Sequence, residues 1–157
     1  MISAASWSPG LKSSSASDEA AWVARLSSEQ CSELYFDWPL WALAEQLPPP
    51  GDWVTWLLLG GRGAGNTRAG AEWVRRLATE GIGPIALVGE TITEAIAVMV
   101  LGASGLMAVT PPGERPQLSG STLHWPNGVV GTILGAADPE RFRGPQFAAA
   151  WSDEVGK

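Results

Sequence analysis

The chain has 157 residues, 45% of them hydrophobic and nine of them tryptophan, which is enough for one domain that buries about 70% of its unfolded surface. The formal net charge of −6 argues against a protein that wraps DNA by itself, because phosphate contacts need clustered lysine and arginine. The single cysteine, Cys31, excludes a disulfide framework and fits a cytoplasmic location. The start of the chain lacks the basic-then-apolar order of a signal peptide, and glycines interrupt the uncharged stretch 95–113, so we expect no membrane span.

The N-terminal part divides into a lead-in and two helices. Residues 1–17 are rich in serine and alanine without a hydrophobic period, so we expect a disordered lead-in before a folded part at 18–157. A helical pattern runs from Asp18 to Leu34, and a second short helix is expected from Asp37 to Gln46. The prolines and the glycine at 48–51 end that helix and act as a stiff spacer.

The centre of the chain is an apolar run that leads into a cluster of glycines. Residues 56–59 read as a buried strand, four glycines follow within six residues, and a helix-forming segment comes next. This is the layout of a phosphate-binding loop, G-x-x-x-x-G-K-[ST], with Gly60, Gly65 and Thr67 in register and Asn66 at the position of the lysine. A glycine-rich turn that binds nothing is the alternative. The candidate nucleotide-binding residues are Gly60, Gly61, Arg62, Gly63, Ala64, Gly65, Asn66, Thr67 and Arg68.

The chemistry of such a loop explains its residue types. Glycine lacks a Cβ, so the backbone can approach a phosphate closely. The N–H groups of the loop and of the start of the following helix then converge on the negative charge. Thr67 has the position of a hydroxyl that ligates Mg²⁺ in this motif.

The segment after the loop has the pattern of an amphipathic helix. Ala69, Trp73 and Leu77 recur at i, i+4 and i+8 and form an apolar stripe. Gly81 is placed to end this helix, because glycine readily adopts the left-handed conformation. Residues 84–88 then read as a second strand, apolar throughout as a parallel sheet with both faces covered requires.

Charged residues lie along the same helix. Glu72 and Arg76 have the favourable i,i+4 order of an ion pair. Arg68, Arg75 and Arg76 make the basic cluster of the chain, for which a solvated helix face is favoured over a contact with DNA or with a neighbouring subunit.

The second half of the chain carries a mostly apolar helix and a loop. Residues 92–101, capped by Thr91 or Thr93, are apolar on nearly every side, so we expect a helix that is buried or covered by a partner. Residues 111–120 read as a polar, proline-rich loop. We therefore expect one apolar helix and one loop in this part of the chain.

A hairpin is the next element. Residues 121–125 and 129–134 flank Pro126-Asn127-Gly128, a strong turn signal because asparagine and glycine tolerate positive φ. His124 reads as a half-buried strand residue, with a catalytic role as the less favoured alternative. A short helical turn is expected to begin at Asp138-Pro139.

Near the C-terminus, the apolar residues 147–151 lead to two adjacent acids, Asp153 and Glu154. In P-loop ATPases, a strand of this kind carries an acid associated with Mg²⁺ and a glutamate that activates water. A solvated strand end is the alternative for the acids taken alone. Together with the glycine loop, they predict a nucleotide site.

Residues 56–74 (WLLLGGRGAGNTRAGAEWV) resemble the ATPase domain of phage large terminase subunits, the DNA-packaging motors, and above all the branch found in gene transfer agents and related prophages. The resemblance covers roughly residues 38–157 and includes five further stretches in order, which are Leu87–Thr91, Trp125–Gly128, Asp138–Glu140, Arg143–Phe147 and Trp151–Glu154. It implies an α/β fold of the P-loop NTPase type, a parallel sheet flanked by helices with a β-hairpin insertion.

The resemblance also implies a mechanism. ATP would be the substrate, with Mg²⁺ held by Thr67 and Asp153 while Glu154 activates the attacking water. Arg62 would sense or neutralise the γ-phosphate, with a surface arginine as its alternative. Arg143 is a weaker candidate for a neighbouring site. The family's partners are double-stranded DNA, the portal protein and the small terminase subunit, without a membrane, and this chain alone is not expected to bind DNA strongly.

Two residues before the loop are candidates for the adenine base. In terminases this segment often contacts adenine, which points to Gln46 and Trp41. A helix surface and a core aromatic are the favoured readings of these two side chains.

Asn66 lowers the nucleotide affinity and the rate of hydrolysis that we expect. Its neutral side chain is too short to follow the phosphates, so affinity should fall by about one to two orders of magnitude and hydrolysis should fall further. The two lysines of the chain, Lys12 and Lys157, are far from the loop. The alternative function is therefore a non-enzymatic remnant or inactive subunit that at most binds a nucleotide or a partner. Because the chain ends three residues after Glu154, we expect an incomplete ATPase domain without the later strands and the nuclease domain.

Overall fold

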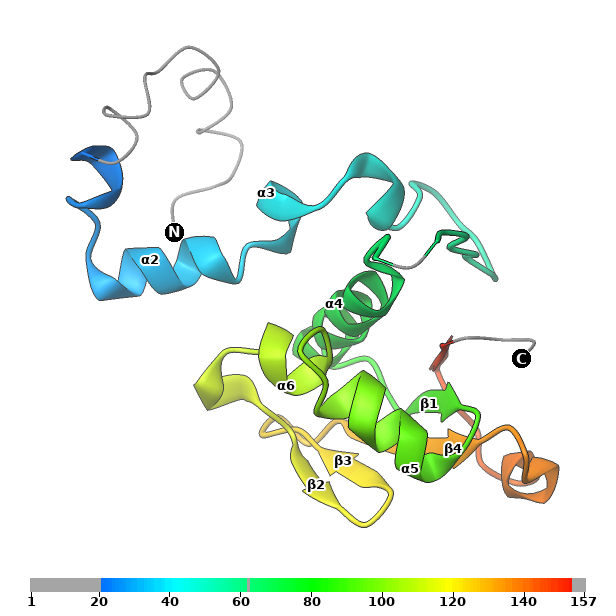
Figure 1. Ribbon diagram of the computed structural model, residues 1–157. Coiled ribbons are helices and arrows are strands. Elements are labelled where there is room, and N and C mark those ends of the chain that lie inside the picture. The colour runs from blue at the N-terminus through cyan, green and yellow to red at the C-terminus, as the bar shows by residue number, and fades with distance from the viewer. Residues whose placement is uncertain (1–20, 62, 154–157) are drawn as a thin grey trace. The chain divides into compact units, whose positions relative to one another are not determined.

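A computed structural model describes residues 21–61 and 63–153. The chain divides into two units between Trp41 and Ala42, and each is described by itself. Figure 1 follows both units in chain order.

The described part of the first unit is helical. Residues 21–23 are helical, α2 spans Ser28–Tyr35 and α3 spans Trp38–Trp41. The helix expected from Asp18 to Leu34 is therefore interrupted, because Ser27 starts a new one: its Oγ accepts from the N–H of Gln30, and Gln30 Oε1 accepts from the N–H of Ser27. No residue of α2 is buried within the described part of the molecule.

The second unit is built on one sheet. Its strands are β1 (Ile85–Gly89), β2 (Gln117–Ser119), β3 (Thr122–His124), β4 (Val130–Gly135) and β5 (Ala149–Ser152), arranged in the order β2-β3-β4-β1-β5. Strand β1 is parallel to β4 and to β5, whereas β2-β3 and β3-β4 are antiparallel. The expected parallel sheet with a hairpin insertion is thus confirmed, and β5 and β2 are its two edges.

Helices lie against this sheet (Figure 1). They are α4 (Asn66–Thr79), α5 (Ile92–Ala95), the π-helical stretch η4 (Ile96–Val100) and α6 (Leu106–Val109). The unit also contains the 3₁₀ turns η3 (Ala44–Gln46), η5 (Pro112–Glu114) and η6 (Pro139–Phe142). Helix α5 contacts β1 and β4, and α4 packs against α6. The core between these layers contains mainly aliphatic side chains, among them Val74, Leu87, Met99, Leu106 and Ile133.

Helix α4 ends as its sequence predicts. Gly81 has φ +77, its N–H donates to Ala78 O at 3.0 Å, and the N–H of Ile82 donates to Leu77 O at 2.9 Å. This pair of bonds is a Schellman motif, which needs a left-handed residue at the position of Gly81. The expected stripe is buried at Ala69 and Leu77 but only half-buried at Trp73, whose ring is tilted by 41° to that of Trp53 with 6.0 Å between the centroids.

The strand expected at 56–59 is not formed. Residues 52–61 contain neither helix nor strand, and Leu57 and Leu59 are 69% and 86% exposed. Apolar composition favours burial, but a strand also needs a hydrogen-bonded neighbour, and the sheet ends at β5 without a strand from this segment. The prediction of a buried strand is therefore wrong for this structure.

The other elements follow the sequence with local differences. Thr91 caps α5, since its Oγ1 accepts from the N–H of Glu94 at 3.1 Å. The apolar helix after it is only partly covered, because Val98 and Leu101 are 42% and 58% exposed. The loop expected at 111–120 contains η5 and β2.

The hairpin turns at Gly128, which has φ +89, as predicted. His124 is exposed and not half-buried, because the alternation of the strand turns Leu123 and Trp125 to the core. Within the described residues, no helix is long and apolar enough to cross a membrane.

Candidate nucleotide site

The glycine loop at 60–65 is closed by local backbone contacts. The N–H of Ala64 donates to Gly61 O at 3.1 Å, and Gly63 and Gly65 both have φ +82, a conformation that other residues rarely adopt. The carbonyl of Gly65 accepts from the N–H of Ala69 at 2.9 Å and so begins α4. The 14-residue helix α4 therefore begins directly after the turn.

Asn66 is the first residue of α4 and lies against the start of the loop. A Cβ added to Gly60 would be 3.0 Å from Asn66 Oδ1 and 2.5 Å from Ala64 Cβ. The close approach of these groups requires glycine at position 60. The carboxamide of Asn66 thus lies over Gly60, at the position where the motif has a lysine.

Thr67 is in contact with the acid at the end of β5. Strand β5 pairs with β1 as far as Val88 and Ser152, and the N–H of Asp153 then donates to Val88 O at 3.0 Å. This ladder fixes Asp153 at the C-terminal tip of the strand. There, Thr67 Oγ1 donates to Asp153 Oδ2 at 3.0 Å in a partly buried position. The structure thus brings together two predicted site residues that are 86 positions apart in the chain.

A cavity of about 1470 Å³ extends between these elements. Its lining contains the glycine loop, the first turn of α4, residues 148–153 and the segment 53–59. The volume exceeds the roughly 300–1,000 Å³ of a typical small-molecule site.

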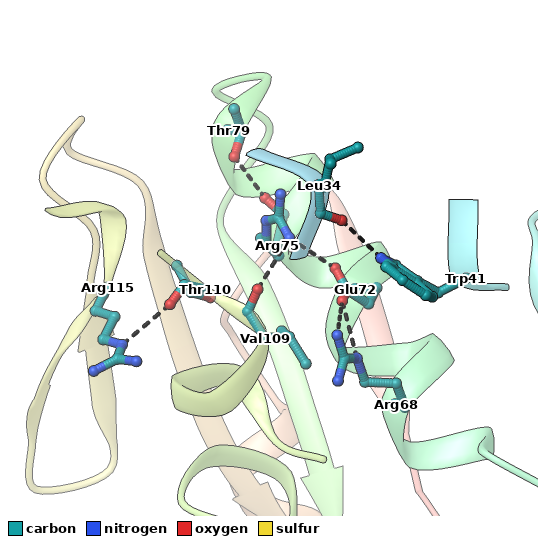
Figure 2. A network of polar contacts seen from close by, with 9 residues as sticks. All are labelled: Leu34, Trp41, Arg68, Glu72, Arg75, Thr79, Val109, Thr110 and Arg115. Atoms are coloured by element: carbon teal, nitrogen blue, oxygen red, sulfur yellow. Dashed lines mark hydrogen bonds and ion pairs between the residues drawn. The ribbon is translucent and has the colours of Figure 1, made fainter. Parts of the chain in front are cut away.

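Arg68 is held by an ion-pair network on α4 (Figure 2). Its Nε and Nη2 are 2.9 and 2.8 Å from Glu72 Oε1, and Arg75 Nη1 is 3.0 Å from Glu72 Oε2 and donates to Val109 O at 3.0 Å. Glu72 is only 4% exposed. Burial raises the pKa of the Glu72 carboxyl, and the guanidinium groups of Arg75 and Arg68 offset only part of that increase.

This network corrects two predictions from the sequence. Glu72 pairs with Arg68 and Arg75 and not with Arg76, which lies 3.6 Å from Glu80. The face that carries Arg68 and Arg75 is also not simply solvated, since their side chains are 24% and 20% exposed. The i,i+4 spacing allows Glu72 to pair with Arg68 as well as with Arg76. In the structure, the buried Glu72 pairs with Arg68 and Arg75, which are the less exposed arginines.

Gln46 makes a contact that its sequence position did not reveal. Its Nε2 donates to the carbonyl of Ala64, inside the glycine loop, at 2.8 Å. The two residues are 18 positions apart and separated by the proline-rich spacer, so no local pattern could have indicated the contact.

Three candidates remain, and the structure describes one of them. Arg62 and Glu154 are outside the described residues. Arg143 is exposed and pairs with Glu140 at 3.1 Å. Within residues 21–61 and 63–153, no group of three or more histidine, cysteine or acidic side chains could hold a metal ion.

The fold and the site define an α/β protein in which a glycine-rich turn leads into a helix beside the acidic tip of a parallel strand. Residues 57–157 match the family described as terminase large subunit, T4-like virus type, N-terminal. This match spans more than half of the chain, and the chain therefore belongs to that family of DNA-packaging proteins. The resemblance to the N-terminal part of terminase large subunits is thereby confirmed. Neither the search of curated proteins nor that of solved structures gave a match.

Proposed function

We propose that residues 60–68 form a phosphate-binding loop for MgATP in the ATPase part of a DNA-packaging terminase. The observation that carries this proposal is the 3.0 Å hydrogen bond between Thr67 Oγ1 and Asp153 Oδ2. It sets a hydroxyl and a carboxylate side by side at the start of a helix, where backbone N–H groups and the helix dipole favour anions. The family to which the chain belongs supports the same assignment.

The donor set fits a magnesium ion. A threonine hydroxyl has one proton and two lone pairs, so donating to Asp153 leaves its lone pairs available to a cation. Mg²⁺ prefers oxygen ligands and usually keeps several waters, with one or two carboxylates nearby. When bound, the ion would neutralise charge on the β- and γ-phosphates. Thr67 would ligate it and Asp153 would orient Thr67 and the bound water.

Two further residues complete the proposal by resemblance to the family. Glu154 would orient or activate the attacking water, and Arg62 would contact the γ-phosphate. Asn66 gives no positive charge to the phosphates, so we propose weak nucleotide binding and little or no hydrolysis.

The test is MgATP binding by titration calorimetry. Thr67→Ala and Asp153→Asn should each weaken Mg²⁺-dependent binding by about 10–100-fold, the usual effect of losing a metal-site residue or its orienting partner. Thr79→Ala, at the far end of α4, and Asp138→Asn, on an exposed turn, are matched controls and should bind as the wild type does. Equal affinity in all five proteins would contradict the proposal.

Asn66 favours a second candidate function. With asparagine in the lysine position, the chain would act as an inactive subunit or remnant that binds at most a nucleotide or a packaging partner. ATP hydrolysis by the chain as it stands, abolished by Glu154→Gln, would exclude this alternative.

The wider setting follows from the family. We propose that the chain acts with double-stranded DNA, the portal protein and the small terminase subunit, in the bacterial cytoplasm during capsid assembly. A membership in the gene-transfer-agent branch is part of the same proposal.

A further inference from the structure

Gln46 has both ends of its carboxamide bound to backbone. Its Oε1 accepts from the N–H of Leu43 at 2.9 Å, and its Nε2 donates to the carbonyl of Ala64 at 2.8 Å. The first partner can only donate and the second can only accept, so the orientation of the amide is fixed by chemistry. The side chain therefore links the turn at 44–46 to the glycine loop.

The same side chain also packs against the residue that ends the loop. A Cβ on Gly65 would lie 2.5 Å from Gln46 Nε2. Gly65 has φ +82, and its carbonyl begins α4 by accepting from the N–H of Ala69. Gln46 thus contacts both residues through which the loop passes into the helix.

Gln46 contacts residues that line the cavity but is not itself a lining residue. Ala64 and Gly65 are in the lining, whereas Gln46 is not. A residue with these contacts can affect a bound ligand through the conformation of Ala64 and Gly65. Both ends of its carboxamide are already bound to backbone groups, the N–H of Leu43 and the carbonyl of Ala64.

We propose that Gln46 is a positioning residue that sets the backbone conformation of the glycine loop and does not read the adenine base. This inference rests on the proposed phosphate-binding function of that loop. It departs from the base-contacting role that family resemblance suggests for the segment before the loop. Loss of the Gln46–Ala64 hydrogen bond should weaken binding of any polyphosphate, whatever base it carries.

The test compares three ligands in the presence of Mg²⁺: ATP, GTP and inorganic tripolyphosphate. Gln46→Glu keeps an acceptor for the N–H of Leu43 but loses the donor to Ala64, and Gln46→Ala loses both. We expect all three ligands to bind about 2–10-fold more weakly, the value of one neutral hydrogen bond, with the ATP-to-GTP ratio unchanged. Gln30→Glu is the control, because Gln30 has the corresponding position in the capping box at the start of α2. It should leave the affinity for all three ligands unchanged.

A second readout does not depend on ligand binding. The N–H groups of Ala64 and Ala69 report the turn and the first bond of α4, so their hydrogen exchange should become faster in Gln46→Glu than in the wild type. Weakening of ATP alone would overturn the inference in favour of a base contact, and so would unchanged affinities with unchanged exchange. If the wild type binds none of the ligands, the proposed function fails, and the exchange rates alone decide whether Gln46 positions the loop.

Discussion

Asn66 is the single residue that most affects the expected activity. It starts α4 beside Gly60, and the nearby Arg68 is directed to Glu72, one turn further along the helix. A cation at position 66 would have its charge at the start of the helix, close to the glycine loop. In the proposed site, the neutral carboxamide of Asn66 gives no positive charge to the phosphates.

Asn66→Lys should therefore raise the affinity for MgATP by about 10–100-fold, the value of one charge-assisted hydrogen bond. Titration calorimetry measures the change. Ser119→Lys adds the same charge on the exposed edge strand β2 and should leave the affinity unchanged. An Asn66→Lys protein that folds and binds no more tightly than the wild type would argue against a phosphate site.

Glu72 should give the stability a pH dependence. Its pKa is raised in the folded state, so the folded protein holds the proton more tightly than the unfolded chain. The contribution is fully present below the ordinary value of 4.5 and is lost as the pH rises through the raised pKa. Urea unfolding of the wild type and of Glu72→Gln should show a difference in free energy that declines across this window.

The control for this experiment is Glu80→Gln. Glu80 is 51% exposed and also pairs with an arginine on α4, so it shares the chemistry of Glu72 without the burial. A difference between wild type and Glu72→Gln that is constant from pH 4 to about pH 8 would contradict the assignment.

Helix α4 packs on β5 through Gly70. A Cβ at this position would overlap the indole of Trp151, which is itself only 7% exposed. In an open helix, glycine to alanine would stabilise by about 1 kcal/mol. Here the added Cβ would force the largely buried indole of Trp151 to shift, so we expect the overlap to outweigh the gain in helix propensity.

Gly70→Ala should lower the free energy of unfolding by about 1–3 kcal/mol, measured by urea denaturation. Gly113→Ala, at a position where an added Cβ meets nothing within 4 Å, is the matched control. The double variant Gly70→Ala/Trp151→Leu should recover part of the loss, and stabilisation by Gly70→Ala alone would disprove the close packing.

Elements whose signals are local could be predicted from the sequence. Helix α4 has its own apolar stripe and its own stop at Gly81, and the hairpin has its turn at Gly128. The segment 56–59 was mispredicted because a strand needs a partner that the segment itself does not encode. For the same reason the partner of Thr67 could be expected only from the family resemblance, and the contact of Gln46 with Ala64 could not be expected at all.

Leucines in different parts of the molecule should differ in how much they contribute to its stability, because they differ in exposure. Leu59 is 86% exposed on the unpaired segment, whereas Leu87 lies at the centre of β1 and is completely buried. Leu59→Ala should change the free energy of unfolding by less than about 0.5 kcal/mol, and Leu87→Ala should lower it by about 2–5 kcal/mol. Thermal or urea unfolding tests both, and a loss of the same size for Leu59→Ala would mean that the segment is packed.

The pairing of Thr67 with Asp153 has a consequence for biosynthesis. The two residues are separated by 86 positions, which a ribosome working at about 5–20 residues per second covers in about 4–17 s. Throughout that interval the nascent chain carries the glycine loop without its carboxylate, because β5 has not yet been made. The hydroxyl–carboxylate pair can therefore form only after β1 and β5 have joined, so an unfinished chain carries no complete site.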